Sequence, residues 1–184
     1  MKDLSLHILD IVQNSVVAQA SNIEIRIEVD KKNDYLAIII TDNGKGMSPE
    51  FLQSVTDPYT TTRTTRKVGL GLPLLKQNAE RTGGSMKIES IVGQGTRLCA
   101  ILNPNNIDCL PMGDIPGVIA MLICSYPSIN FYFTQIVNSR DFSISSGEIA
   151  DALDGLPLNN PSVYPLVKEL IASNLDELQI SELG

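Results

Sequence analysis

Residues 42–47 read DNGKGM, and they come directly after an apolar stretch at residues 35–41 (YLAIIIT). An apolar run of this length predicts a central strand that is covered on both faces. Ser48 and Pro49 follow the glycines and predict a helix start, because serine caps helices well and proline fits the first turn. A helix start directly after the glycines argues against a plain hairpin. The stretch therefore predicts a glycine turn that ends a strand and leads into a helix.

The segments on either side of this turn alternate between helix and strand patterns. Residues 3–20 carry apolar side chains at helical spacing, and residues 23–30 (IEIRIEVD) alternate as in a half-buried strand. Further on, residues 72–82 predict a helix, and residues 86–91 and 96–102 predict two strands. This order of elements predicts a domain of mixed helices and strands.

Residues 103–106 (NPNN) form the only obvious boundary in the sequence. Beyond it we expect a helix at residues 114–125, a hairpin at residues 129–145 and two further helices. The last of these is expected to begin after Asn160, which would cap it, with Pro161 in its first turn. Ser145 and Glu148 have the spacing of a capping box at the start of the first of these two. We therefore expect two domains, residues 1–103 and a small α+β domain of unknown role at residues 104–184.

The composition is that of an ordinary globular protein with an acidic balance. The chain has 184 residues and a formal net charge of −7, which argues against nucleic acid and anionic membranes as partners. The longest apolar stretch, residues 115–124, is shorter than the roughly 20 residues needed to cross a bilayer. Three cysteines without paired spacing indicate reduced thiols. We expect a cytoplasmic protein.

Four short motifs occur in order along the first part of the chain. An acid precedes an asparagine by four residues on the first helix, DNGKG follows a strand, GLGL opens a helix, and GQGT precedes a strand. Each is weak alone, since glycine-rich turns are common. Together they resemble the GHKL ATPase superfamily, which includes gyrase-type topoisomerases, MutL-type mismatch-repair proteins, histidine kinases and anti-sigma-factor serine kinases. The matching segments are residues 9–15, 42–46, 69–72 and 93–96.

This resemblance covers residues 1–103 and implies a fold and two cofactors. The fold would be the Bergerat fold, a two-layer α/β sandwich with a mixed, largely antiparallel sheet. The cofactors would be ATP and Mg²⁺. The resemblance does not extend to residues 104–184.

Asn14 and Asp10 form the first motif. Asparagine is a poor helix former, and its amide oxygen suits Mg²⁺, which also takes triphosphate oxygens. The matching family residue holds the metal, so Asn14 is the expected metal ligand; the alternative is an exposed polar residue. Asp10 lies one turn earlier on the same face and matches the glutamate that hydrolases use as general base. Aspartate is shorter than glutamate by a methylene, and reach matters for a general base. The alternative interpretation of Asp10 is a surface carboxylate near Asn14.

Three neighbours of this motif carry weaker signals. His7 is the only histidine in the chain and lies seven residues before Asn14, hence on the same helical face. It is a candidate phosphoacceptor or proton shuttle, but we favour a packing or supporting role. Gln13 and Ser15 are interpreted as flanking polar residues.

Asp42, Gly44, Gly46 and Thr96 are expected at the purine. A carboxylate can accept the N6 amino hydrogens of adenine, which distinguishes adenine from guanine. The two glycines let the backbone approach the base and permit positive φ. Thr96 resembles the family threonine that reaches the carboxylate and adenine through water, and is otherwise a simple strand residue.

The phosphate end is predicted from a loop and the glycines after it. Residues 60–67 (TTTRTTRK) resemble the family's ATP lid, which closes on nucleotide. Backbone N–H groups at the mouth of the following helix can hold phosphates. The nucleotide-binding residues expected here are Lys67, Gly69, Leu70 and Gly71. Arg63 and Arg66 are further cations that could neutralise the triphosphate. Each could equally be a solvated loop residue.

Three functions stay open at this point. The small size and the GLGL motif favour an ATP-dependent protein kinase that acts in trans on an unidentified partner. The first helix and the DNGKGM turn look closer to the MutL branch, which suggests a nucleotide-gated switch with slow or no hydrolysis. The third interpretation is an inert ATP-sensing module.

Overall fold

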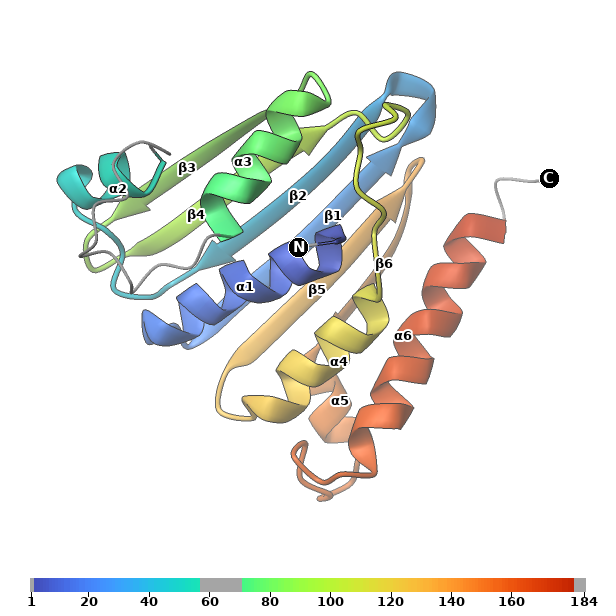
Figure 1. Cartoon of the computed structure of the whole chain (residues 1–184). Helices are drawn as coiled ribbons and strands as arrows, with labels where there is room; N and C mark the ends of the chain where they lie inside the picture. Colours follow the sequence, from blue (N-terminus) through green and yellow to red (C-terminus); the bar gives the residue numbers. More distant parts are fainter. Residues whose placement is uncertain (1, 57–70, 181–184) are drawn as a thin grey trace.

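The computed structural model describes residues 2–56 and 71–180. Its centre is a single six-stranded sheet in the order β3-β4-β2-β1-β5-β6 (Figure 1). The strands are β1 (Asn22–Asp30), β2 (Tyr35–Asp42), β3 (Ser85–Ile91), β4 (Gly95–Leu102), β5 (Asn130–Val137) and β6 (Arg140–Ser145). Of the five pairs that these strands form, four are antiparallel and the β1–β5 pair is parallel. The mixed, largely antiparallel sheet is therefore confirmed.

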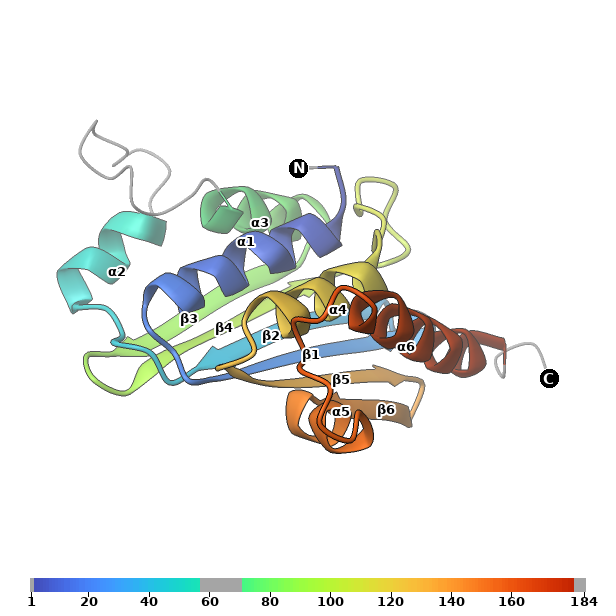
Figure 2. The ribbon, with the colours of Figure 1, turned by 90° about the horizontal axis from the view of Figure 1, so that it is seen from below.

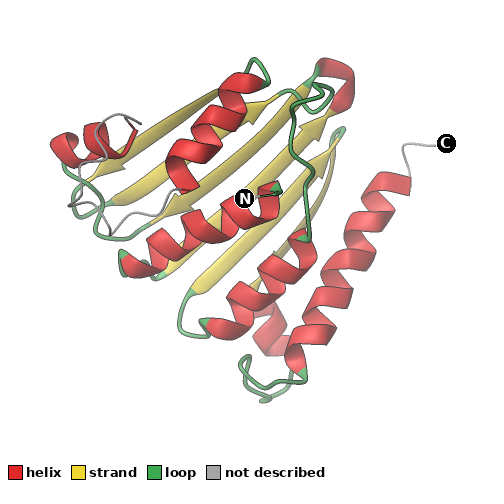
Figure 3. Cartoon of the chain, in the orientation of Figure 1, coloured by secondary structure: helices red, strands yellow, loops and turns green. Residues whose placement is uncertain are grey.

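The longer helices cover one face of this sheet. Figure 2 shows α1, α3 and α4 on that face, with α2 and α6 towards its two ends, and α5 on the opposite side beside β6 (Figure 3). Their bounds are α1 (Leu4–Val17), α2 (Pro49–Thr56), α3 (Gly71–Arg81), α4 (Ile115–Ser125), α5 (Ser146–Ala152) and α6 (Val163–Ile180), with a short 3-10 turn at Lys31–Asn33. No helix in the described ranges is both long and apolar enough to span a bilayer.

Helix α1 follows directly from its sequence. The Asp3 side chain caps its first turn by accepting from the Leu6 amide at 3.0 Å. Its apolar stripe, which includes Ile8 and Val12, is fully buried against the sheet. The helix ends at Val17 rather than at the predicted residue 20, because Gln19 adopts the left-handed conformation with φ of 59°.

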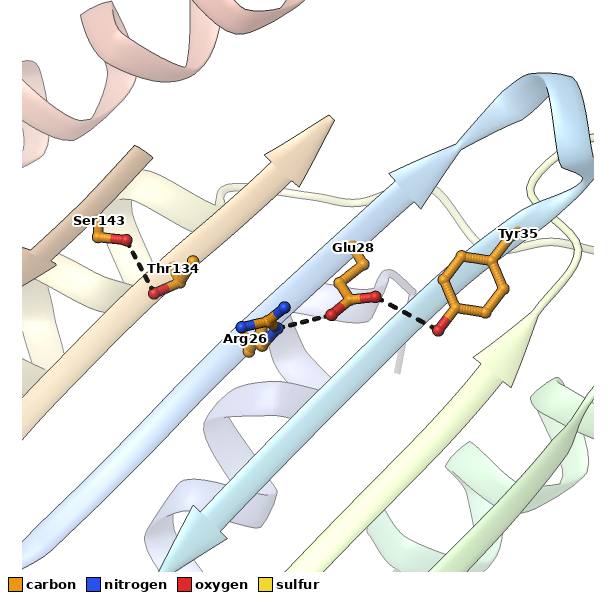
Figure 4. A network of polar contacts seen from close by, with 5 residues as sticks. All are labelled: Arg26, Glu28, Tyr35, Thr134 and Ser143. Carbon is orange, nitrogen blue, oxygen red and sulfur yellow. Dashed lines mark hydrogen bonds and ion pairs between the residues drawn. The ribbon is translucent and has the colours of Figure 1, made fainter. Parts of the chain in front are cut away.

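Strand β2 lies at the centre of the sheet, as predicted, but helices cover only one of its faces. Ile38 and Ile40 are buried on the helix side, whereas Tyr35 on the far face is half-buried. No helix in the described part of the chain lies over that far face of β2. The same face of the sheet instead carries polar contacts, including an ion pair of 2.6 Å between Arg26 and Glu28 on the neighbouring strand β1 (Figure 4).

Residues 104–184, expected as a separate small domain, instead complete the sheet of the first part. Strand β5 pairs with β1 along its length, from Asn22 opposite Asn130 to Val29 opposite Val137. Buried residues from both parts form one hydrophobic core. The physical reason is that β2 occupies only one edge of β1, so the other edge needs a partner strand. Helix α4 connects β4 to β5, two strands of this sheet that run in the same direction, and so serves as a crossover between them.

Two further local predictions can be compared with the structure. The capping box of α5 is confirmed, because Ser145 accepts from the Glu148 amide and the Glu148 carboxylate accepts from the Ser145 amide. Helix α6 was expected directly after Asn160 but begins at Val163. The Asn160 side chain accepts from the Ser162 amide at 3.0 Å and so forms a turn ahead of the helix.

Candidate functional site

A pocket of about 270 Å³ lies between the helix layer and the sheet. Its apolar wall comes from α1, α2, α3 and three strands, and consists mainly of Ile11, Ile40, Met47, Phe51, Leu72, Ile88 and Leu98. Its polar lining residues are Asn14, Ser15, Asp42, Lys45 and Thr96. A largely apolar hollow with a few polar groups is the usual form of a small-molecule site.

Asn14 and Asp42 line this same pocket, although they lie on different elements of the fold. Asn14 belongs to α1, and Asp42 is the last residue of β2. The Asn14 Nδ2 atom is buried and has no hydrogen-bond partner among the described residues. An unused buried amide is costly unless something else binds it, so its place in the pocket wall marks it as a candidate ligand contact.

The Asp42 carboxylate is held from two sides. Ser15 Oγ donates to Oδ2 at 2.6 Å, and the Gly44 amide donates to Oδ1 at 2.8 Å. Each carboxylate oxygen can accept more than one hydrogen bond, so both retain capacity for a ligand donor. The two contacts fix the orientation of the group before any ligand binds.

Ser15 is a site residue that the sequence interpretation missed. It was taken as a flanking polar residue, yet it is only 4% exposed, lines the pocket and donates to the Asp42 carboxylate. The signal was present, because Ser15 lies four residues after Ile11 and so falls on the apolar stripe of α1. A serine on a buried stripe needs a polar partner, and here that partner is Asp42.

Gly46 and Thr96, two of the residues expected at the purine, also line the pocket. Gly46 has φ of 67°, and a Cβ there would lie 2.0 Å from the Ile91 carbonyl oxygen, so only glycine fits. Thr96 pairs with Asp42 in the β2–β4 register. Its hydroxyl lies 2.9 Å from that of Ser90, which also accepts from the Met47 amide and ties the glycine turn to β3.

Asp10 lies where α1 meets the start of α3. A Cβ added to Gly71 would be 1.9 Å from Asp10 Oδ2, so a side chain at residue 71 would force the Asp10 carboxylate to move. Oδ2 is buried and has no hydrogen-bond partner among the described residues. Asp10 is therefore no freely solvated surface carboxylate: it lies beside the N-terminal end of a helix, where the dipole favours negative charge.

His7 lies one turn before Asp10 and is 0% exposed. Its Nε2 is 3.1 Å from Asn78 Nδ2 on α3. This burial agrees with the packing interpretation of His7. Burial lowers the pKa of His7 from its ordinary value of 6.5, because an apolar surrounding disfavours the charged ring, while the backbone of Gly71 opposes this in part.

A lowered His7 pKa makes stability depend on pH in a defined direction. In the unfolded chain the His7 ring binds a proton near pH 6.5, whereas in the folded chain it does so only at a lower pH. The His7 contribution to the free energy of unfolding is therefore fully present above pH 6.5 and is lost as the pH falls below that value. We expect His7→Gln to reduce the loss of unfolding free energy between pH 7.5 and 5.5, with a limit of about 1.4 kcal/mol per pH unit for one proton. Urea titrations of both proteins at the two pH values would measure this; equal losses in both would contradict it.

The remaining predicted residues lie outside the described part of the chain. These are Lys67, Gly69 and Leu70, together with Arg63, Arg66 and the rest of the expected lid. Among the described residues there is no cluster of three or more His, Cys, Asp or Glu side chains that could hold a metal by themselves. Mg²⁺ does not require such a cluster, because one amide oxygen, ligand phosphates and water can together complete its coordination.

The fold and the pocket together define a class of protein. Helices pack on one face of a mixed sheet, and the pocket between them has a carboxylate at a strand end and an asparagine on the first helix. This is the ATP-binding arrangement of histidine kinase-like ATPase domains. The chain belongs to the family of histidine kinase-, DNA gyrase B- and HSP90-like ATPases, whose pattern matches residues 2–106.

Sensor kinases are among the relatives that this chain matches over about half of its length or less. The sensor histidine kinase ZraS of Salmonella typhimurium is 34% identical over 89 residues, which are 48% of this chain and 19% of that protein. A probable C4-dicarboxylate sensor kinase of Bacillus subtilis is 36% identical over 78 residues, 42% of this chain and 15% of that protein. The chain thus spans less than a fifth of the length of either relative.

Solved structures show the same fold over a longer part of the chain. The ATPase domain of Aquifex aeolicus MutL, complexed with ADP, has a TM-score of 0.50 and 16% identity, covering 84% of this chain and 70% of that one. The N-terminal domain of a DNA repair protein has a TM-score of 0.56 and 16% identity, covering 78% and 52%. Both cover more than residues 2–106, so the shared fold includes some of the chain beyond them.

Proposed function

We propose that this chain binds ATP with Mg²⁺ in the pocket and transfers the γ-phosphate to a separate protein. The observation that carries the proposal is the position of Asn14 and Asp42 in the wall of one pocket. Membership of the ATPase family and the sensor kinase relatives support it. The acceptor is a protein partner whose identity the chemistry of the site does not specify.

The purine would lie at the Asp42 end of the pocket. Because Ser15 and Gly44 already hold the carboxylate, its remaining lone pairs can accept the amino hydrogens of adenine. Apolar side chains such as Ile40 and Leu98 would contact the faces of the base. Thr96, which pairs with Asp42 across the strands, would support the same end.

The phosphates would lie at the other end, where α1 meets α3. Mg²⁺ would be held by the Asn14 side chain and would neutralise charge on the triphosphate. The N-terminus of α3 at Gly71 would add backbone donors and a favourable dipole. Lys67, Gly69 and Leu70 are proposed to contact the phosphates from the preceding segment.

Asp10 is proposed as the base for transfer. As the acceptor atom forms its bond to the γ-phosphorus, the bond to the β–γ bridging oxygen breaks and ADP leaves. Asp10 takes the proton from the acceptor, directly or through one water. Its buried Oδ2 has no protein partner in the described residues and can therefore accept that proton.

The second candidate function is a nucleotide-gated switch with slow hydrolysis or none. The observation that favours it is the sheet itself, because β1 pairs with β2, which carries Asp42, and also with β5 from the second part of the chain. A change at the pocket can therefore reach residues 104–184 through two adjoining strand pairs.

Labelling distinguishes the two functions. The chain would be incubated with γ-labelled ATP and Mg²⁺ in the presence and absence of a cell lysate. Label on a protein of the lysate would support a kinase in trans. Free labelled phosphate, or bound ATP that is not consumed, would contradict it and support the switch.

Replacing Asn14 tests the metal end of the pocket. We expect Asn14→Ala to weaken Mg-ATP binding by about 10- to 100-fold, as the loss of metal-site partners commonly does, and to change metal-free ADP binding much less. Gln13→Ala, an exposed amide on the same helix, is the matched control and should bind like the wild type. Calorimetry with and without Mg²⁺ measures both; an equal loss for both ligands would remove Asn14 from the metal site.

A further inference from the structure

We propose that His7 and Asn78 form a polar clamp between α1 and α3, and that His7 is a positioning residue for the phosphate end of the pocket. This inference rests on the proposed function. It assigns a task to a buried histidine that neither adenine binding nor phosphoryl transfer uses.

The clamp is built from groups that have few other partners. His7 Nε2 lies 3.1 Å from Asn78 Nδ2, which makes the amide the donor when the ring is neutral with its proton on Nδ1. His7 is 0% exposed, so it has no access to water that could replace this contact. A buried polar ring is costly without a hydrogen bond, and the contact offsets that cost only while α1 and α3 keep their spacing.

The clamp acts together with a second contact between the same two helices. Asp10, one turn along α1 from His7, approaches Gly71 so closely that a Cβ on that glycine would lie 1.9 Å from Oδ2. Asn78 lies two turns along α3 from Gly71. One point of contact lets a helix pivot, whereas two separated points fix its direction relative to its neighbour.

These two contacts set the geometry of the groups expected at the phosphates. Helix α1 carries Asp10 and Asn14, and α3 begins at Gly71. Asp42 is less exposed to a loss of the clamp, because it lies on β2, is held by the Gly44 amide, and contacts α1 only through Ser15, about two turns from His7. Loss of the clamp should therefore affect triphosphate and metal binding while the purine end is largely preserved.

The test compares Mg-ATP with adenosine in the full chain. We expect His7→Leu, which keeps apolar volume and removes the polar contact, to weaken Mg-ATP by about 10-fold or more relative to adenosine. His7→Gln retains an acceptor for Asn78 and should restore much of the affinity. Asn78→Ala should show the same selective loss, and adding it to His7→Leu should cost little more, since both remove one interaction.

The controls separate a positioning role from a purely structural one. Gln77→Ala changes an exposed amide on α3 and should leave both affinities unchanged. Should His7→Leu fail to fold, the half-buried Asn78 carries the test alone through Asn78→Ala. Equal weakening of adenosine and Mg-ATP, or additive losses in the double variant, would overturn the clamp. A wild-type chain that binds neither ligand would instead refute the proposed function.

Discussion

Replacing Asp10 by asparagine is expected to lower phosphoryl transfer by about 10²- to 10⁴-fold, the usual contribution of a positioned base, with little change in the affinity for Mg-ATP. The amide has the same shape as the carboxylate and fits beside Gly71 without a new clash. It cannot take a proton from the acceptor. Single-turnover transfer of label from γ-labelled ATP to the partner protein measures the rate, and calorimetry measures the affinity separately.

Asp151→Asn supplies the matched control for this experiment. Asp151 is an exposed carboxylate on α5, on the opposite side of the sheet from α1, so its replacement should leave transfer and binding unchanged. If Asp10→Asn transfers phosphate at the wild-type rate, Asp10 has no part in proton transfer. Its buried position beside α3 would then serve only the packing of the two helices.

The fold of the first hundred residues could be predicted because its signals are local. The alternation of residues 23–30 gives one buried face of β1, and the glycine turn with Ser48 gives the start of α2, where Ser48 Oγ accepts from the Phe51 amide. Capping at Ser145 is equally local. Such patterns depend on neighbours within a few residues, so the sequence displays them directly.

The place of residues 104–184 could not be predicted in the same way. An alternating strand pattern states which side chains face the core but not which strand lies alongside. Strand β5 has the pattern of a half-buried strand, and Phe131 and Phe133 are 1% exposed. No residue near them in the sequence, however, identifies β1 as the partner strand. The pairing of Asn22 with Asn130 joins residues more than a hundred positions apart.

The candidate site shows the same division. The residue types at Asn14, Asp42 and Thr96 suggested ligand contacts, and the fold brings all three to one pocket. The supporting contacts escaped prediction, because the partner of Ser15 lies on β2 and the partner of His7 lies on α3. A buried polar residue on an apolar stripe shows that a partner exists, while its identity emerges only from the packed structure.

The second large effect is expected from Asp42→Asn, which should weaken ATP by about 10²- to 10⁴-fold. A hydrogen bond to a charged group contributes about 1.5–3 kcal/mol, and an unpaired donor left in the pocket costs about 1–3 kcal/mol more. The Gly44 amide donates to Oδ1 and requires an acceptor there. The new NH₂ group must therefore take the place of Oδ2, beside the Ser15 hydroxyl, which can rotate to accept.

This exchange of acceptor for donor makes the prediction specific to the base. Adenine presents an amino donor to the pocket, whereas hypoxanthine presents a carbonyl acceptor at the same position. We expect the variant to lose its preference for ATP over inosine triphosphate, because the new donor matches the carbonyl oxygen. Asp141→Asn, an exposed carboxylate on β6, should retain the wild-type preference. If Asp42→Asn weakens the binding of both triphosphates equally, the carboxylate supports the glycine turn and does not determine which purine is bound.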